Sequence, residues 1–137
     1  MQPFMEAIRV ELERNREEGS LYQELSSKIY GMKVPQETEP PYLWYLSPGP
    51  SPDDRCFDGR IERLDIQVNL VAASFSEAAR LGVMVEAILD GSKLMFPSTP
   101  ELVSVECLRS GTSWILEVDK LWQWTQVFRV TAFRSRV

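Results

Sequence analysis

Apolar and polar residues alternate with a period of two over residues 61–72, which predicts a β-strand with one face on a core. The apolar residues occupy the even positions and include Leu64, Ile66, Val68, Leu70 and Ala72. The polar residues occupy odd positions, namely Asp65, Gln67 and Asn69. The pattern therefore predicts a long strand whose odd side faces water.

The period changes to about 3.6 directly after this strand. Ser74 and Glu77 have the Ser-x-x-Glu spacing of a capping box, which marks the start of a helix. Asp90 and Gly91 provide a stop signal. Between these signals the apolar residues recur at helical spacing, at Ala78, Leu81, Met84, Val85 and Ile88. We expect an amphipathic helix here.

The N-terminal segment has a similar helical pattern. Pro3 suits the first turn of a helix, and Phe4, Ile8 and Leu12 share one face. We expect Gly19 to end this helix.

A weaker capping signal follows at Ser20 and Gln23, and it predicts a short helical turn through Leu25. Ile29 and Tyr30 can then form a brief extended segment.

Residues 42–46 are apolar on both parities and rich in aromatic side chains. This pattern predicts a strand that is covered on both sides, with the core on one side and a subunit contact as a candidate for the other. Residues 47–54 follow, with prolines at positions 48, 50 and 52. We expect a stiff loop that is neither strand nor helix, and long ordered loops tend to be functional.

Two further strands are predicted near the C-terminus, at about residues 101–109 and 122–133. Residues 96–100 form a break before the first of them, and residues 110–112 begin the connection between them. In the last strand the even positions are apolar except for Gln126.

The resulting order of elements is α-β-β-α-β-β. The simplest architecture is an α+β fold of two layers, in which a mostly antiparallel four-stranded sheet has the helices packed on one face. A length of 137 residues fits a single domain over residues 1–137.

Composition and charge exclude several classes of function. A content of 44% hydrophobic and 26% charged residues is ordinary for a soluble globular protein. No apolar run approaches the roughly 20 residues that span a bilayer, and the acidic N-terminus has no apolar core of a secretory signal, so we expect cytoplasmic synthesis and no membrane contact. The net charge of −5 argues against specific nucleic-acid binding.

The chain contains no histidine, which removes the usual general base and histidine-based metal sites. Cys56 and Cys107 are too few for a disulfide framework. Cys107 shares parity with Val103 and Val105, so we expect a buried thiol there and an incidental exposed thiol at Cys56. We expect no cofactor and no metal.

Two groups of carboxylates keep an enzymatic alternative open, because a carboxylate pair can act as acid and base. The candidates are Asp53, Asp54 and Asp58 in the proline loop, and Glu117 with Asp119 before the last strand. Solvated loop positions explain both groups more simply.

The tryptophans at positions 44, 114, 122 and 124 alternate with polar residues, which favours core packing over stacking platforms for bases or sugars. Trp122 begins its strand and is the tryptophan that best suits an interface.

The order of elements and several local strings resemble the tail-completion (tail terminator) proteins of long-tailed bacteriophages and prophages. The resemblance spans about Phe4 to Phe133. The strings are Lys28-Ile29-Tyr30, Pro40-Pro41-Tyr42-Leu43-Trp44-Tyr45, Ile66-Gln67-Val68-Asn69-Leu70, Ser76-Glu77-Ala78-Ala79-Arg80 and Val127-Phe128-Arg129-Val130-Thr131-Ala132-Phe133. The proline-rich segment from Pro48 to Pro52 departs from the family pattern.

This resemblance implies a structural protein without catalytic residues, which forms a ring, commonly a hexamer, on the end of the tail tube and provides the surface that docks to the head. The implied partners are further copies of the chain, the tail tube protein and a head-side connector protein, and DNA could pass through the ring. The implied locations are the host cytoplasm during assembly and the tail of the virion. Expected subunit or tail-tube contacts are Tyr42, Trp44, Asp53, Asp54, Arg55, Phe57, Arg60 and Trp122.

Two alternatives stay open at this stage. One is another head–tail connector or completion component. The other, from a different class, is a carboxylate-only hydrolase or a domain that binds a small ligand.

Overall fold

The computed structural model of the protein describes residues 2–50, 54–56 and 59–135. The helices and strands follow the chain in the order α1 (Gln2–Glu13), α2 (Leu21–Glu24), β1 (Ile29–Gly31), β2 (Tyr42–Pro50), β3 (Asp54–Cys56), β4 (Gly59–Ala72), α3 (Phe75–Leu89), β5 (Leu102–Val118) and β6 (Leu121–Ser135).

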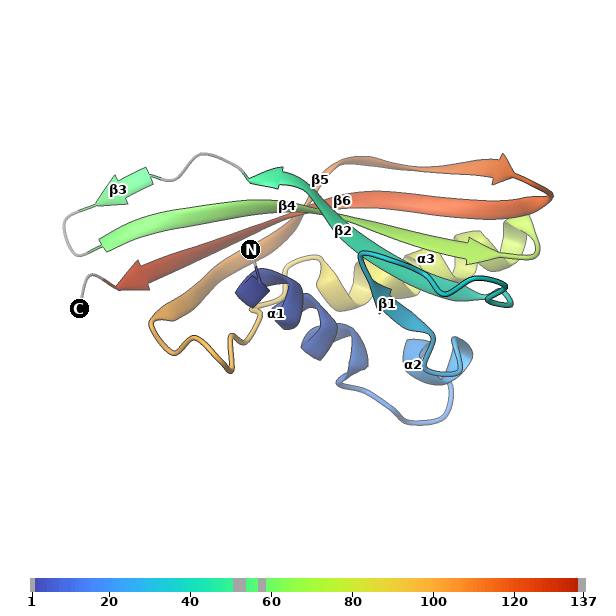
Figure 1. Ribbon diagram of the computed structural model, residues 1–137, viewed down its shortest axis with the longest axis horizontal. Coiled ribbons are helices and arrows are strands. Elements are labelled where there is room, and N and C mark those ends of the chain that lie inside the picture. The colour runs from blue at the N-terminus through green and yellow to red at the C-terminus, as the bar shows by residue number, and fades with distance from the viewer. Residues whose placement is uncertain (1, 51–53, 57–58, 136–137) are drawn as a thin grey trace.

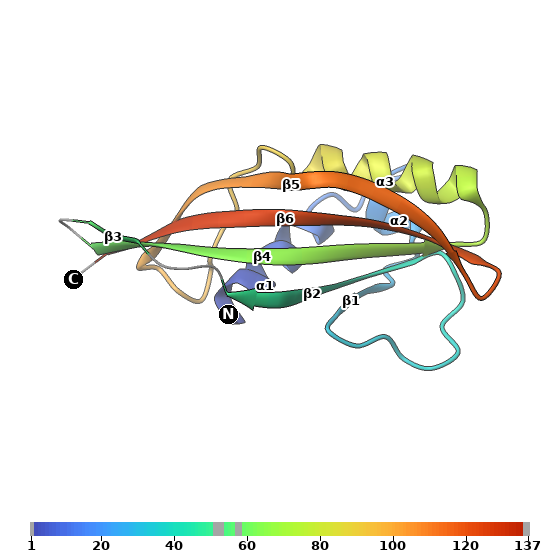
Figure 2. The ribbon, with the colours of Figure 1, turned by 90° about the horizontal axis from the view of Figure 1, so that it is seen from above.

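A six-stranded, twisted sheet forms one layer, and the helices lie together on one of its faces (Figures 1 and 2). Five strands form the path β1-β2-β4-β6-β5, and β3 pairs with β4 beside this path. All neighbours are antiparallel except β1, which is parallel to β2. The α+β class is confirmed, but the expected four-stranded sheet is wrong. Two strands of three residues, β1 and β3, extend it and are too short to produce a readable period.

The first helix packs as predicted but ends earlier. Phe4, Ile8 and Leu12 are buried, whereas α1 stops at Glu13 instead of Gly19. Residues 14–19 are exposed, so a further helical turn would have no core to cover. The side chain of Asn15 accepts a hydrogen bond from the backbone N–H of Glu17 at 3.0 Å, a local bond that competes with the helix.

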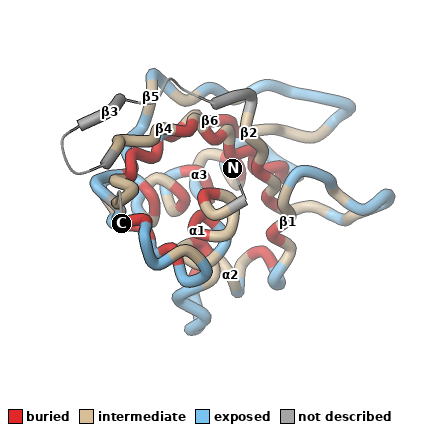
Figure 3. Tube along the Cα trace, turned by 60° about the vertical axis from the view of Figure 1, so that its left-hand side comes forward, coloured by how far each residue is buried: buried red, intermediate tan, exposed pale blue. Residues whose placement is uncertain are grey.

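The predicted strand–helix unit forms the centre of the core. The even-numbered residues of β4 from Leu64 to Ala72 are buried, and Ser74 Oγ accepts a hydrogen bond from the N–H of Glu77 at 3.2 Å. The short predicted helix is also present, with Ser20 capping α2. Figure 3 shows the buried segments where the sheet meets the helices. The buried face of α3 consists of Ala78, Leu81, Gly82, Val85 and Leu89.

The proline-rich segment does not form the predicted loop throughout. Strand β2 continues through residues 47–50, and β3 then forms a short hairpin with the start of β4. The pairing of β2 with β4 shifts register between Leu46 and Gly49. An irregular position in an edge region tolerates proline, which explains why the prolines did not end the strand. Residues 51–53, part of the predicted loop, lie outside the described residues.

The last two strands form one long hairpin, contrary to the expected connection at residues 110–112. Strand β5 runs through these residues to Val118, with a register shift between Ser110 and Trp114. The turn consists of Asp119 and Lys120, whose φ angles of 51° and 67° match a type I′ hairpin turn. Glu117 and Asp119 therefore lie at the exposed end of this hairpin and not in a loop before the last strand.

Cys107 is buried as predicted, but its neighbours are not. Val103 and Val105 are exposed although they share its parity. A register shift between Ser104 and Glu106 reverses which residues face the core, so the parity argument fails across this bulge. The side chain of Cys56 lies outside the described part of the structure.

Candidate assembly surfaces

Strand β5 forms one edge of the sheet and exposes a series of apolar side chains. Six of them are between 40% and 59% exposed: Val103, Val105, Leu108, Trp114, Leu116 and Val118. A long edge strand offers unpaired backbone groups, and apolar side chains gain free energy when they leave water. The combination makes β5 a candidate contact with another protein chain.

Most of these side chains belong to the sheet face opposite the helices, which we call the outer face. In the cross-strand pairing, Trp114 lies beside Thr125, Leu116 beside Gln123, and Val118 beside Leu121. Directly paired residues of neighbouring strands share a face. Trp124 and Phe128, at the alternate positions of β6, are buried beneath the sheet.

Tyr42 and Trp44 occupy the outer face on the other side of the sheet. Trp44 pairs with Asn69, Asn69 with Thr125, and Thr125 with Trp114. A row across four strands therefore has a tryptophan at each end and two polar residues between them. The sequence predicted that residues 42–46 form a strand covered on both sides. The core side is confirmed, because Leu43 and Tyr45 are buried.

Asn69 lies at the centre of this row and is fully buried, contrary to the expectation that the odd side of β4 faces water. Its Oδ1 atom accepts hydrogen bonds from Gln67 Nε2 at 3.0 Å, Gln123 Nε2 at 3.1 Å and Thr125 Oγ1 at 2.9 Å. The odd-numbered polar residues thus bind one another, and the outer face consists of a hydrogen-bonded polar floor between two aromatic borders.

An ion pair continues the outer face toward the β3 end of the sheet. Arg129 donates from Nε to Asp65 Oδ1 at 2.9 Å and from Nη2 to Asp65 Oδ2 at 3.2 Å. The hydrogen bond with Asp65 raises the pKa of the exposed Arg129 side chain. Both charges are paired within the chain. The exposed apolar side chains of β5 are therefore the part of the outer face that is best suited to contact another chain.

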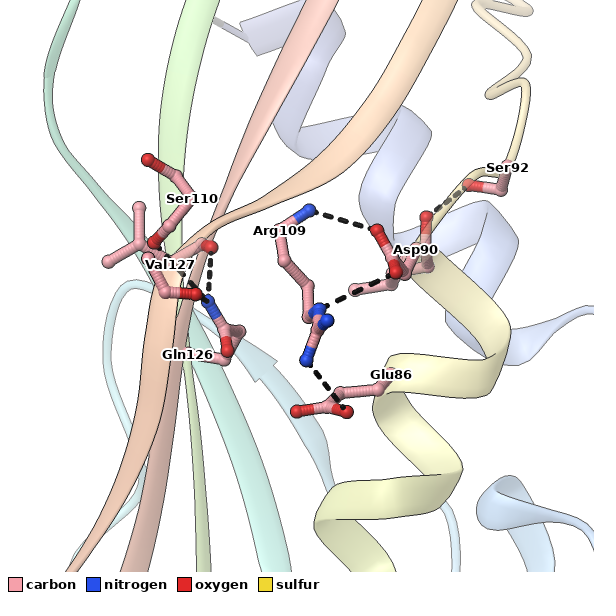
Figure 4. Close-up of polar contacts among 9 residues, drawn as sticks. Glu86, Asp90, Ser92, Arg109, Ser110, Gln126 and Val127 are labelled. Carbon is pink, nitrogen blue, oxygen red and sulfur yellow. Dashed lines mark hydrogen bonds and ion pairs between the residues drawn. The ribbon is translucent and has the colours of Figure 1, made fainter.

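The free edge of β5 is closed at one point by the segment that follows α3 (Figure 4). Gly91 donates its N–H to the carbonyl of Cys107 at 2.7 Å, and Cys107 donates to the carbonyl of Ser92 at 3.1 Å. The N–H of Arg109 donates to Asp90 Oδ1 at 3.0 Å, and its guanidinium pairs with Asp90 at 3.5 Å and Glu86 at 3.6 Å. These contacts fasten the end of α3 to the edge strand.

Gln126 supports the bulge in β5 from the neighbouring strand (Figure 4). It is fully buried and donates from Nε2 to the carbonyls of Ser110 and Gly111, each at 3.3 Å, and of Val127 at 2.8 Å. The sequence showed Gln126 only as an interruption in an apolar pattern. Its amide group thus links β6 to the two residues of β5 at which the bulge begins.

Three shallow hollows border these surfaces. One of about 460 Å³ lies between α3 and β5, with Phe75, Val83, Trp114 and Ile115 among its lining residues. Two others, of about 390 and 130 Å³, adjoin Tyr42 on the outer face. Each is lined by no more than one carboxylate, so these hollows do not hold the paired carboxylates of the hydrolase alternative. Among the residues that the structure describes, no group of three side chains is arranged to hold a metal ion.

The predicted contact residues lie in different parts of the molecule. Tyr42 and Trp44 share the outer face. Trp122 is half-buried on the helix side, where its ring meets that of Phe75 edge-to-face at 5.5 Å. Asp54 and Arg55 belong to β3, where only the backbone is described, and Asp53, Phe57 and Asp58 lie outside the described residues.

Arg60 takes part in an ion-pair cluster at the β3 end of the sheet. Its Nε donates to Glu62 Oε2 at 2.9 Å, and Arg134 also pairs with Glu62 and with Glu101. Partial burial alone would raise the pKa of Glu62, but the hydrogen bonds from Arg134 and Arg60 outweigh it and lower the pKa.

The sequence interpretation missed the apolar outer side of β5. Trp114, Leu116 and Val118 alternate with Ser113, Ile115 and Glu117 in the signature of a strand. The string Ser110-Gly111-Thr112 indicated a connection, although here Gly111, with a φ of 82°, forms part of a bulge. A bulge and a turn use the same residue types, and this ambiguity concealed the surface.

The fold therefore combines two layers, an outer face with a polar centre and aromatic borders, and an edge strand with exposed apolar side chains, features that suit a protein of an assembly. The family can be named from the sequence. A family model described as tail completion protein gp17 matches residues 6–131, and the chain belongs to that family. The protein is therefore a structural component of a bacteriophage tail.

Solved structures show the same fold. A chain from the virion of a native gene transfer agent particle superimposes with a TM-score of 0.73 and 17% sequence identity, over 94% of this chain and 93% of the other. A second solved structure matches with a TM-score of 0.52 and 15% identity over 96% of both chains. The chain matches no curated protein sequence. In the described part of the chain, no helix is long and apolar enough to cross a membrane.

Proposed function

We propose that the protein completes the phage tail by forming a closed ring, a hexamer, on the end of the tail tube, where it provides the surface that docks to the head. The observation that carries this proposal is the apolar, open-edged β5 strand beside an outer face bordered by aromatic side chains. Membership in the tail completion family supports it.

In a ring of more than two subunits each subunit contacts two neighbours in head-to-tail fashion, so it needs two different, complementary surfaces. The ring closes when the rotations between neighbours add up to a full turn. The sheet offers two such surfaces at its opposite edges, at β1 and at β5. A chain that used one self-complementary patch would stop at a dimer. We propose further copies of this chain, the tail tube protein and a head-side connector protein as its partners.

The proposed contacts with the tail tube or neighbouring subunits include the outer-face residues Tyr42 and Trp44, together with Trp122 on the helix side. Strand β3 and the start of β4 lie at the opposite end of the sheet from the β5–β6 turn (Figure 1). Asp54 and Arg55 belong to β3 and Arg60 to β4, whereas Asp53 and Phe57, which we also propose as contacts, lie outside the described residues. A surface at that end is suited to a second partner. The net charge of −5 would let DNA pass the ring with little adhesion, since each neutralised phosphate adds affinity.

A pair of substitutions on the outer face tests the proposal. Leu116→Ser with Val118→Ser removes two exposed apolar side chains and should leave the melting temperature within about 3 °C of wild type. We expect the variant to fail in completing tails, measured as infectious particles formed when purified protein is added to an extract that lacks it. Met95→Ser is the matched control, because Met95 is equally exposed but lies in the loop after α3.

Full tail-completing activity of the double variant would remove the outer face from the mechanism. An equal loss of tail-completing activity in the Met95→Ser control would show that the assay responds to any loss of exposed apolar area, wherever it lies.

A further inference from the structure

The open part of the β5 edge begins after Arg109. Both backbone groups of Cys107, and the N–H of Arg109, bind residues 90–92 and so point away from β6. Cys107 and Arg109 are paired with Val130 and Phe128 of β6, and these pairs do not exchange backbone hydrogen bonds because the groups of Cys107 and Arg109 point outward. The even-numbered residues of β6 therefore form the pairs with β5 that are not hydrogen-bonded. The next such pairs are Trp124 with Ile115 and Trp122 with Glu117. The backbone groups of Ile115 and Glu117 therefore point outward from the sheet.

Strand β1 presents the same arrangement at the opposite edge. The carbonyl of Lys28 accepts from the N–H of Leu43 at 3.0 Å, and the N–H of Met32 donates to the carbonyl of Tyr45 at 2.7 Å. In a parallel ladder these bonds flank the one residue that faces the neighbouring strand, which here is Tyr30. The carbonyl of Ile29 and the N–H of Gly31 therefore point away from β2. The connection over residues 32–41 lies beside this edge (Figure 2).

The two edges lie at the same height along the sheet. Following the pairing across it, Tyr30 is level with Trp44, Asn69, Thr125 and finally Trp114. One step along, Ile29 is level with Leu43, Leu70, Trp124 and Ile115. A rotation about an axis that runs along the strands would thus bring β1 of one copy beside residues 113–117 of β5 in the next.

In that position the strand directions and the side-chain facing agree, and β1 offers two outward backbone groups, the carbonyl of Ile29 and the N–H of Gly31. Strands β1 and β5 run in opposite directions, so they would pair as antiparallel strands. Ile29 would be opposite Ile115, and both side chains lie on the helix side. The N–H of Ile115 can donate to the outward carbonyl of Ile29, whereas the N–H of Ile29 already donates to the carbonyl of Ser27 at 2.9 Å. Tyr30 would be opposite Trp114 on the outer face, an aromatic pair of the kind that stabilises sheets.

Charge also favours a second copy at this edge. Glu117 and Asp119 are exposed at the end of β5, and neither forms an ion pair with a basic side chain among the described residues. Lys28 directly precedes β1, and its Nζ donates to a backbone carbonyl, that of Glu39, rather than to a carboxylate. In the aligned position, Lys28 of the neighbouring copy is opposite Leu116, one residue before Glu117 on β5.

We propose that β1 of one copy pairs antiparallel with residues 113–117 of β5 in the next, so that the sheets of neighbouring subunits form one continuous sheet around the ring. This inference rests on the proposed ring and specifies the contact that closes it. Each subunit would supply β5 at one side and β1 at the other, which is the head-to-tail contact that a ring needs.

Cysteine cross-linking on assembled tails tests the pairing. In an antiparallel pair that is not hydrogen-bonded, opposite Cα atoms lie about 4.5 Å apart, which a disulfide can span. Tyr30→Cys with Trp114→Cys, in a Cys56→Ser background, should therefore give covalent oligomers up to the full ring on mild oxidation. Cys107 can stay, because it is buried and burial raises the pKa of its thiol to about 12.

The matched control is Tyr30→Cys with Leu108→Cys. Leu108 also lies on the outer face, but its partner Arg129 is four residues along β6 from Thr125, about 13 Å away. We expect no covalent oligomers from this pair. The single variants Tyr30→Cys and Trp114→Cys should give none either, because the proposed contact joins β1 to β5 and never places two copies of the same residue side by side.

Hydrogen exchange of the unmodified protein gives a second measurement that does not depend on the variants folding. Peptides covering residues 27–33 and 111–118 should exchange at least tenfold more slowly in rings on tail tubes than in the free chain. Rings that form without this protection, or without cross-links in the Tyr30/Trp114 pair, would overturn the β1–β5 contact and leave the proposed function standing. If the wild-type protein forms no ring at all, the proposed function itself fails.

Discussion

Gly82 lies where α3 packs against Trp124 of β6. A Cβ atom added at this position would lie 2.5 Å from Trp124 Nε1, well inside contact distance. Glycine in a helix interior costs about 1 kcal/mol relative to alanine, so a free surface position would favour the replacement. The close approach of helix and sheet explains why glycine occupies this position despite that cost.

Gly82→Ala should destabilise the protein by about 1–3 kcal/mol, because Trp124 must move to make room. Chemical denaturation measures the change in the free energy of unfolding. The matched control is Ala87→Gly at an exposed position of α3, which should cost about 1 kcal/mol through helix propensity alone. A Gly82→Ala variant that is more stable than wild type would contradict the packing described for Trp124.

Residue patterns predicted some positions correctly and concealed others. The alternation of Leu64 to Ala72 and the cap at Ser74 could be read from the sequence because each depends on local geometry. The burial of Asn69 could not, since it depends on Gln123 and Thr125, more than 50 residues away along the chain. Distant partners of this kind leave no signal within a single strand.

At the scale of elements, β4 is the strand that organises the sheet, because it pairs with β2, β3 and β6. The sequence predicted its existence, its facing and the helix that follows. It predicted a brief extended segment at Ile29 and Tyr30 but not that this segment joins the sheet as β1. It did not predict β3, which is short, or the full length of β5, which crosses a bulge that resembles a turn. Long regular elements carry a period, whereas bulges and three-residue strands do not.

Opposite faces of β4 should respond differently to substitution. Val68→Asp would bury a carboxylate without a partner and should destabilise by several kcal/mol, enough to prevent folding. Gln67→Ala should cost only about 1 kcal/mol, because it removes one of three donors to Asn69 Oδ1. Thermal unfolding followed by circular dichroism compares the two variants, and equal melting temperatures would refute the facing of the strand.

At the scale of the whole molecule, the helices cover one face of the sheet and leave exposed apolar side chains on the other face, at Trp114, Leu116 and Val118 of the edge strand β5. Such a surface has no use in an isolated chain and adds a risk of aggregation. In a tail completion protein it is explained if copies of the chain join edge to edge and rest on the tail tube. The sequence led to the family, but the surface could be located only once β5 had been placed.

The number of chains on a completed tail tests the central claim most directly. Light scattering of the purified protein, alone and after binding to purified tail tubes, measures that number, and electron microscopy of the tube ends shows its symmetry. We predict six chains per tube end, arranged as a closed ring. A protein that stays monomeric on tail tubes, or that binds them in an open or variable number of copies, would contradict the account.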